Sequence, residues 1–165
     1  MLTLQMKMVS SLEKCFWDDA IESKQEKTSF VMFENERLSF QVAYRATDDT
    51  MNIQRFAPVK IGGALAPFAK VRLVENVPNV YPTYNVNPGG EFLRTDPGLY
   101  PDMLRPLIYP DAVALPNGQT HALWVDIELP CDFAAGTYDI SLSISVGEEC
   151  LGEVKGEVKV IIPCI

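Results

Sequence analysis

Residues 38–45 have the sequence Leu-Ser-Phe-Gln-Val-Ala-Tyr-Arg. Large apolar side chains occupy every second position, with polar or small ones between them, as in a β-strand that has one face in a hydrophobic core. The same alternation returns in 123–129 and 140–146. Pro130 and Gly136 lie between these two stretches, where they favour a turn. We therefore expect consecutive antiparallel strands near the carboxyl end.

The rest of the chain adds further strands. Residues 2–8 alternate, 29–33 form a short β-prone run, and a last strand is expected at roughly 154–162. The stretch 10–27 is ambiguous, because its first residues fit a capping box and apolar residues recur four apart. Many short strands without helix–strand alternation predict an all-β fold. We expect an antiparallel β-sandwich, immunoglobulin-like or jelly-roll-like, of about seven to nine strands.

The middle of the chain is rich in proline. Eight of the 12 prolines lie in 78–116, together with many aromatic and aliphatic residues. This composition predicts a long, ordered loop region, and such loops in compact domains usually bind something or dock on another surface. The candidate residues for a domain interface or a sugar contact are Tyr81, Tyr84, Tyr100, Asp102 and Tyr109.

Length and charge limit the class of protein. The 165 residues have a mass of 18.4 kDa, which fits one domain spanning 1–165. The net charge is −8, so the broad positive field that attracts nucleic acid or an anionic membrane is not expected. No segment approaches the roughly 18 apolar residues of a membrane span. Localisation stays open, with the cytoplasm favoured because no secretory signal is visible.

Few residue types suited to metal binding or nucleophilic catalysis are present. The four cysteines are far apart without a CxxC pair, and His121 is the only histidine. We therefore expect no zinc site and no cofactor, and we expect the cysteines to be mostly buried and reduced. No GxSxG motif accompanies His121, so a nucleophilic triad is not predicted.

Asp126 and Glu128 are the best candidates for a pair of catalytic acids. They are two apart on a predicted strand, hence on one face and about 7 Å apart by strand rise. Glycosidases use two carboxylates at such separations. A solvated polar face of a sandwich produces the same pattern, and we favour this second interpretation. No catalytic residue is therefore assigned.

Four stretches carry a specific combination of motifs. They are SSLEK at 10–14, ERLSFQVAYR at 36–45, GLYPDMLRPL at 98–107, and LWVDI at 123–127 followed by Pro130 and AGTY at 135–138. In this combination the chain resembles the amino-terminal domain of glycoside hydrolase family 123 and its uncharacterised bacterial relatives. The resemblance spans nearly the whole chain.

The resemblance implies a β-sandwich placed before a larger (β/α)8 barrel. In the family, the barrel carries a neighbouring Asp-Glu pair that hydrolyses β-N-acetylgalactosaminides with help from the substrate's own acetamido group. Asp-Glu does not occur as a dipeptide here. We therefore expect a non-catalytic scaffold that docks on a downstream barrel of the same polypeptide, so that only the full-length protein would be a glycoside hydrolase.

Two further expectations concern the proline-rich region. The alternative to a scaffold is a carbohydrate-binding module that uses exposed aromatic residues of 78–116. We expect Tyr100, Pro101 and Asp102 to lie on a loop that meets the following domain. Asp102 should then bond to backbone amides or to an arginine.

Overall fold

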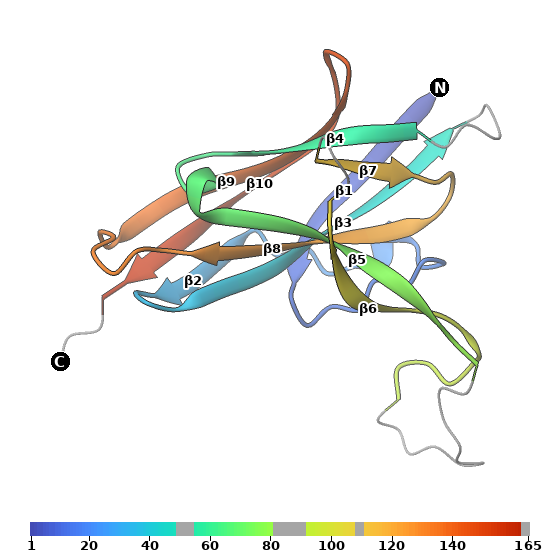
Figure 1. Cartoon of the computed structure of the whole chain (residues 1–165), viewed down its shortest axis with the longest axis horizontal. Helices are drawn as coiled ribbons and strands as arrows, with labels where there is room; N and C mark the ends of the chain where they lie inside the picture. Colours follow the sequence, from blue (N-terminus) through green and yellow to red (C-terminus); the bar gives the residue numbers. More distant parts are fainter. Residues whose placement is uncertain (49–54, 81–91, 108–110, 163–165) are drawn as a thin grey trace.

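The computed structural model describes residues 1–48, 55–80, 92–107 and 111–162. Within these ranges ten strands form two sheets that pack face to face (Figure 1). The elements are β1 (Leu2–Ser10), β2 (Ser29–Phe33), β3 (Arg37–Asp48), β4 (Arg55–Gly62), β5 (Ala69–Asn79), β6 (Gly98–Pro106), β7 (Ala112–Leu115), β8 (Thr120–Glu128), β9 (Gly136–Val146) and β10 (Glu149–Ile161), with 3-10 turns η1 (Ile21–Ser23) and η2 (Ala66–Phe68).

The predicted all-β sandwich is confirmed. The first sheet has the order β1-β3-β8-β5-β6 and the second β2-β10-β9-β4-β7. All the strand pairs are antiparallel except β2 with β10, which run parallel. The described strands number ten, more than the seven to nine expected, because β6 and β7 lie in the region interpreted as a loop.

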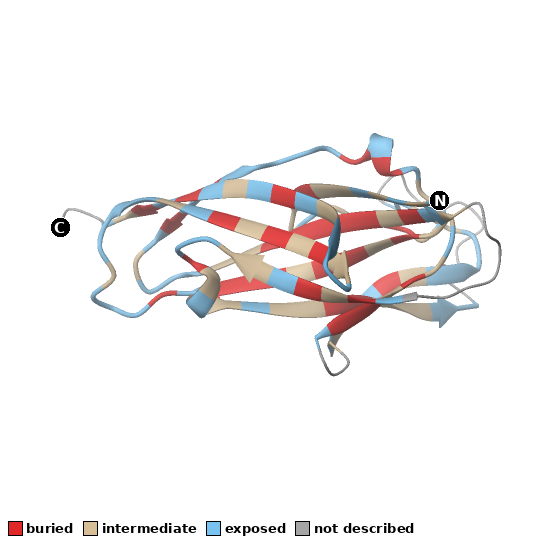
Figure 2. Cartoon of the chain, turned by 90° about the horizontal axis from the view of Figure 1, so that it is seen from above, coloured by how far each residue is buried: buried red, intermediate tan, exposed pale blue. Residues whose placement is uncertain are grey.

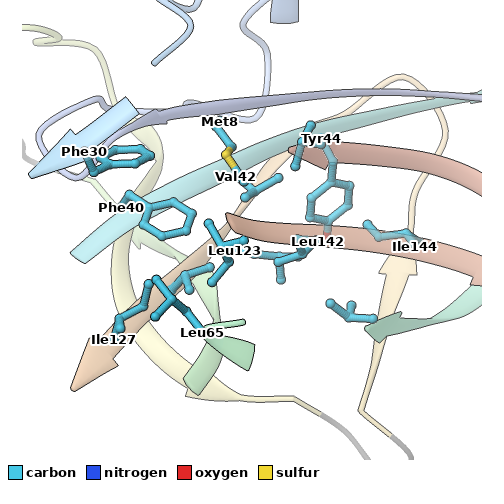
Figure 3. Packing of buried hydrophobic residues seen from close by; sticks show 14 of the residues in the cluster. Met8, Phe30, Phe40, Val42, Tyr44, Leu65, Leu123, Ile127, Leu142 and Ile144 are labelled. Carbon is cyan, nitrogen blue, oxygen red and sulfur yellow. The ribbon is translucent and has the colours of Figure 1, made fainter. Parts of the chain in front are cut away.

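Alternation along the central strands places the core between the two sheets (Figure 2). Phe40, Val42 and Tyr44 of β3 point into it, each at most 1% exposed. They pack with Leu123 of β8 and Leu142 of β9, so both sheets contribute to one cluster (Figure 3). Burying side chains of this size stabilises the fold by about 1.5–3 kcal/mol each.

The opposite face of β3 is not the solvated surface that alternation alone predicts. Gln41 is 4% exposed and Ala43 is fully buried. The irregular segment 11–28 covers them, and it packs Cys15 and Ile21 into a second, smaller hydrophobic cluster. Within the first sheet, β3 is therefore covered on both faces.

The helical alternative for 10–27 is wrong. Only the short η1 turn is helical, and β1 extends to Ser10. The capping box that Ser10 and Glu13 would fit is absent, since the Ser10 hydroxyl accepts a hydrogen bond from Leu12 N at 3.3 Å instead. Side chains from elsewhere bond the carbonyls of this segment: Gln41 Nε2 donates to Ser10 O and Glu13 O at 3.2 and 2.7 Å. A helix would use these carbonyls internally.

The proline-rich region is only partly a loop. Its β6 pairs with β5 at the edge of the first sheet, and its β7 pairs with β4. Tyr100, Pro101 and Asp102 lie inside β6, so the expectation that they occupy a loop is wrong. Prolines 101 and 106 fit because an edge strand needs only one side of its backbone for pairing.

Two glycines of β10 let β1 of the first sheet approach the second sheet closely. A Cβ added to Gly152 would lie 2.8 Å from the sulfur of Met6, and one added to Gly156 would lie 2.8 Å from that of Met8. The same Gly156 position is 2.7 Å from Thr28 O. At Gly152 an added Cβ would displace the flexible Met6 side chain, whereas at Gly156 it would also press on the main chain at Thr28.

Candidate functional site

A cavity of about 250 Å³ opens on the outer face of the first sheet. We call it the Trp124 cavity. Its floor comes from four neighbouring strands, which supply Gln41, Trp124, Val74 and Leu104. The segment 11–14 forms one wall, and Pro101 and Asp102 of β6 form another.

The position of Trp124 is fixed by a buried carboxylate. Its indole Nε1 donates to Asp126 Oδ1 at 2.8 Å, and the Ser39 hydroxyl donates to the same oxygen at 2.6 Å. Arg72 forms an ion pair with the other oxygen of Asp126. Burial raises the pKa of Asp126, but the hydrogen bonds from Ser39, Trp124 and Arg72 outweigh it and hold the pKa below its usual range.

These bonds decide the role of the two strand carboxylates. Asp126 is 6% exposed and uses both oxygens within the protein, so the solvated-face interpretation is wrong for this residue. Glu128 is exposed and pairs with Arg37. A general acid must carry a proton at working pH, whereas Asp126 is stabilised in its charged form. The arrangement holds Trp124 and does not resemble a pair of catalytic acids.

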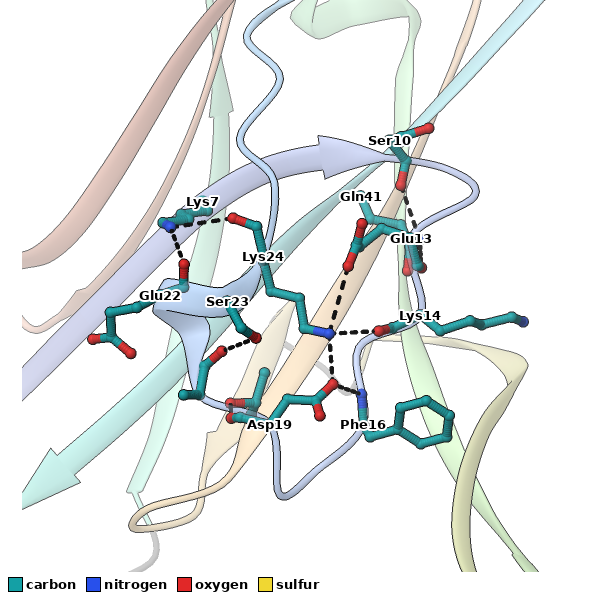
Figure 4. A network of polar contacts seen from close by, with 12 residues as sticks. Lys7, Ser10, Glu13, Lys14, Phe16, Asp19, Glu22, Ser23, Lys24 and Gln41 are labelled. Atoms are coloured by element: carbon teal, nitrogen blue, oxygen red, sulfur yellow. Dashed lines mark hydrogen bonds and ion pairs between the residues drawn. The ribbon is translucent and has the colours of Figure 1, made fainter. Parts of the chain in front are cut away.

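A second polar network holds the wall formed by segment 11–14 (Figure 4). Lys24, which is 8% exposed, donates to Lys14 O at 2.7 Å and to Asp19 Oδ2 at 2.5 Å. Its Nζ also lies 3.5 Å from Glu13 Oε1. Burial lowers the pKa of Lys24, but the hydrogen bond and charge of Asp19 outweigh it and raise the pKa.

The structure brings only some of the predicted residues to this face. The Tyr100 hydroxyl donates to Asp96 O at 2.6 Å, and the Tyr100 ring lies edge-on to Phe16 with 5.7 Å between centroids. Asp102 lines the Trp124 cavity and is exposed. No described residue gives it the amide or arginine bond we expected. The other three candidates, Tyr81, Tyr84 and Tyr109, lie outside the described residues.

Sequence reasoning missed Arg94, which ties the start of the β6 region to segment 11–28. Its guanidinium lies 3.9 Å from the centroid of the Phe16 ring. It also pairs with Asp18 at 2.8 Å and lies 3.6 Å from Asp19. The contact joins residues more than 70 positions apart, and no local pattern signals it.

Cysteines and metal-binding residues give no further site. Cys15 is buried, but Cys131 and Cys150 are exposed, so the prediction of mostly buried thiols is wrong for two of the three described. The described ranges contain no group of three His, Cys, Asp or Glu side chains arranged for a metal ion. In those same ranges no helix has the length and hydrophobicity needed to cross a bilayer.

One solved structure supports the fold. A family 123 glycoside hydrolase from Clostridium perfringens matches 98% of this chain with a TM-score of 0.69 and 11% sequence identity. The chain covers 27% of that hydrolase. The N-terminal domain of PorA and a PapD-like domain of human CEP192 also match, each with a TM-score of 0.36, at 9% and 8% identity. The match to the PorA domain covers 94% of this chain and 97% of that domain. The match to the CEP192 domain covers 96% of this chain and 83% of that domain.

No family model matches the chain, and no curated protein matches it. At 11% identity the match to the hydrolase concerns the fold alone. The chain therefore has the sandwich fold of one part of a much longer glycoside hydrolase.

Proposed function

We propose that this chain is a non-catalytic accessory domain of a glycoside-hydrolase-like protein, and that it docks on a catalytic barrel that follows it in the same polypeptide. One observation carries the proposal: nearly the whole chain, 98%, superposes on 27% of a family 123 hydrolase. The motifs at 36–45 and 98–107 support the same relationship. The proposal assigns the hydrolysis of glycosides to the barrel.

The absence of an assembled acid pair in the described residues agrees with this role. Asp126 is tied to Ser39, Trp124 and Arg72, and Glu128 is paired with Arg37. Most glycoside hydrolases use a protonated acid and a second carboxylate that flank the scissile glycosidic bond. The residues best suited by sequence therefore serve the fold.

We expect docking at the end of the sandwich where β10 finishes. Ile162 follows β10 there and is 46% exposed, and Glu34 N donates to Ile161 O at 3.2 Å. This hydrogen bond places the turn after β2 beside the last residue of β10. Phe33 in that turn region is 49% exposed. β5 ends and β6 begins at the opposite end of the molecule (Figure 1).

The test uses the complete polypeptide encoded by the gene, compared with residues 1–165 alone. Hydrogen exchange is measured on both, and the amides of the turn after β2 are expected to exchange more slowly in the longer protein. Phe33→Ser should weaken this protection. Phe56→Ser is the matched control, since Phe56 is 56% exposed and β4 begins at the far end. Equal effects of the two substitutions, or unchanged exchange, would contradict docking at this end.

A further inference from the structure

Two charged side chains at the Trp124 cavity make no polar contact with the part of the chain that the structure describes. Asp102 and Lys14 both line it and both are exposed. Neither side chain forms a hydrogen bond or ion pair with any residue in the described ranges. Each can therefore bond to a ligand without breaking a contact that stabilises the sandwich.

The backbone of β6 is irregular at Asp102. Met103 pairs with Glu75 and Pro101 pairs with Asn76, so Asp102 has no partner on β5. This is the geometry of a β-bulge, in which an extra residue is left unpaired and its side chain is redirected. Here the bulge places a carboxylate at the rim of the cavity.

The floor of the cavity is apolar where Trp124 lies. The only polar atom of the indole is already bonded to Asp126, so the ring presents carbon to the cavity. Val74 and Leu104 extend this floor. The Nε2 of Gln41 lies within hydrogen-bonding distance of three carbonyls of segment 10–13, which occupy its two hydrogens, so it is not available to a ligand.

The charges around the cavity nearly cancel. Glu13 lies 3.5 Å from the ammonium of Lys24, which offsets its charge. Asp102 and Lys14 add one negative and one positive charge. A ligand that matches this lining is uncharged, has an apolar face, and carries groups that donate to a carboxylate and accept from an ammonium.

We propose that the Trp124 cavity binds one glycosyl unit of a carbohydrate. A pyranose ring has an apolar face of C–H groups, which fits over the indole, and hydroxyls that both donate and accept. Asp102 accepts from one hydroxyl, and Lys14 donates to another. Segment 11–14 forms the wall of the cavity, four strands form its floor, and the bulge forms its rim. The site therefore exists in the folded chain before sugar binds. This binding does not depend on docking to a barrel.

The experiment measures binding of methyl glycosides to residues 1–165. The chain has two tryptophans, so Trp17→Phe leaves Trp124 as the only indole reporter. The probes are methyl glycosides of a neutral hexose, an N-acetylhexosamine and a uronic acid, with arginine amide as a cationic probe. We expect a saturable fluorescence change with at least one neutral glycoside. Affinity should fall about tenfold or more in Asp102→Ala, as for loss of a charge-assisted hydrogen bond.

Asp132→Ala is the matched control, because Asp132 is also exposed and lies outside the cavity. Thermal melting shows that each variant is folded, and Asp102→Ala should melt with the control. Three results would each overturn the proposal: no saturable change with any neutral glycoside, equal affinity in Asp102→Ala and Asp132→Ala, or binding of arginine amide or the uronic acid alone. The isolated chain suffices for these measurements, so their failure leaves docking to be judged separately.

Discussion

Replacing Lys24 with methionine tests how the segment 11–28 is held on the sheet. Methionine keeps the length of the buried stem and removes the ammonium that contacts Asp19 at 2.5 Å and Lys14 O at 2.7 Å. Removing one partner of a buried ion pair typically costs about 3–5 kcal/mol. The Asp19 side chain is 21% exposed and keeps Arg94 at 3.6 Å, so we expect a smaller loss of roughly 2–4 kcal/mol.

The assay is thermal and urea unfolding of Lys24→Met beside Lys159→Met. Lys159 is an exposed lysine of β10, so its variant removes the same charge without a buried contact. For a domain of this size the expected loss lowers the melting temperature by roughly 5–15 °C. If the two variants unfold within about 0.5 kcal/mol of each other, the ammonium does not hold the segment and our interpretation is refuted.

The pH dependence of stability gives an independent measurement on the same residue. The pKa of Lys24 is raised in the folded protein above its value of about 10.4 in an unfolded chain. Its contribution to the free energy of unfolding is therefore complete below that unfolded value. It is lost as the pH rises through the folded pKa. Wild type should lose stability in this alkaline range more steeply than Lys24→Met.

Three other substitutions or measurements test the remaining features. Asp126→Asn should lower the free energy of unfolding by roughly 1–3 kcal/mol. Wild type should lose this contribution below about pH 4, as the pH falls through the lowered folded pKa of Asp126. Equal stability of wild type and Asp126→Asn at pH 7 would contradict the role of Asp126 in holding Trp124. Cys131 and Cys150 should react quickly with a thiol reagent at pH 8, whereas Cys15 should react only on unfolding, because burial raises its pKa to about 11. Fast labelling of Cys15 itself in the folded chain, located by peptide mass mapping, would contradict this assignment. Gly156→Ala should lower the melting temperature, since its Cβ would lie 2.7 Å from the main-chain oxygen of Thr28. A melting temperature equal to wild type would show that the segment before β2 moves away from β10 at little cost.

The central strands could be predicted because their alternation follows directly from burial on one face. Phe40, Val42 and Tyr44 point into the core as the sequence pattern indicates. The cover over the opposite face could not be predicted, because segment 11–28 is held by side-chain bonds over long separations. Gln41 reaches carbonyls about 30 positions away, and such contacts leave no periodic signal.

The candidate site was only partly predictable for a similar reason. The sequence singles out Asp102 by its proline-rich surroundings, but Trp124 appears only within the LWVDI stretch of a predicted strand. The cavity forms where β6, β8 and segment 11–14 meet, and this meeting depends on the order of strands in the sheet. Strand order is a tertiary property that a single sequence pattern does not encode.

The prolines of β6 also bear on how the domain meets a partner. Strand edges are the usual place for one sheet to add a strand from another chain. Proline has no N–H, so Pro101 and Pro106 interrupt the donors along β6. Regular strand addition at this edge of the first sheet is therefore disfavoured, even though Leu99 and Met103 are exposed there. The docking that we propose uses side chains at the end where Ile161 finishes β10, so it would leave the Trp124 cavity on the outer face open to the sugar that we propose.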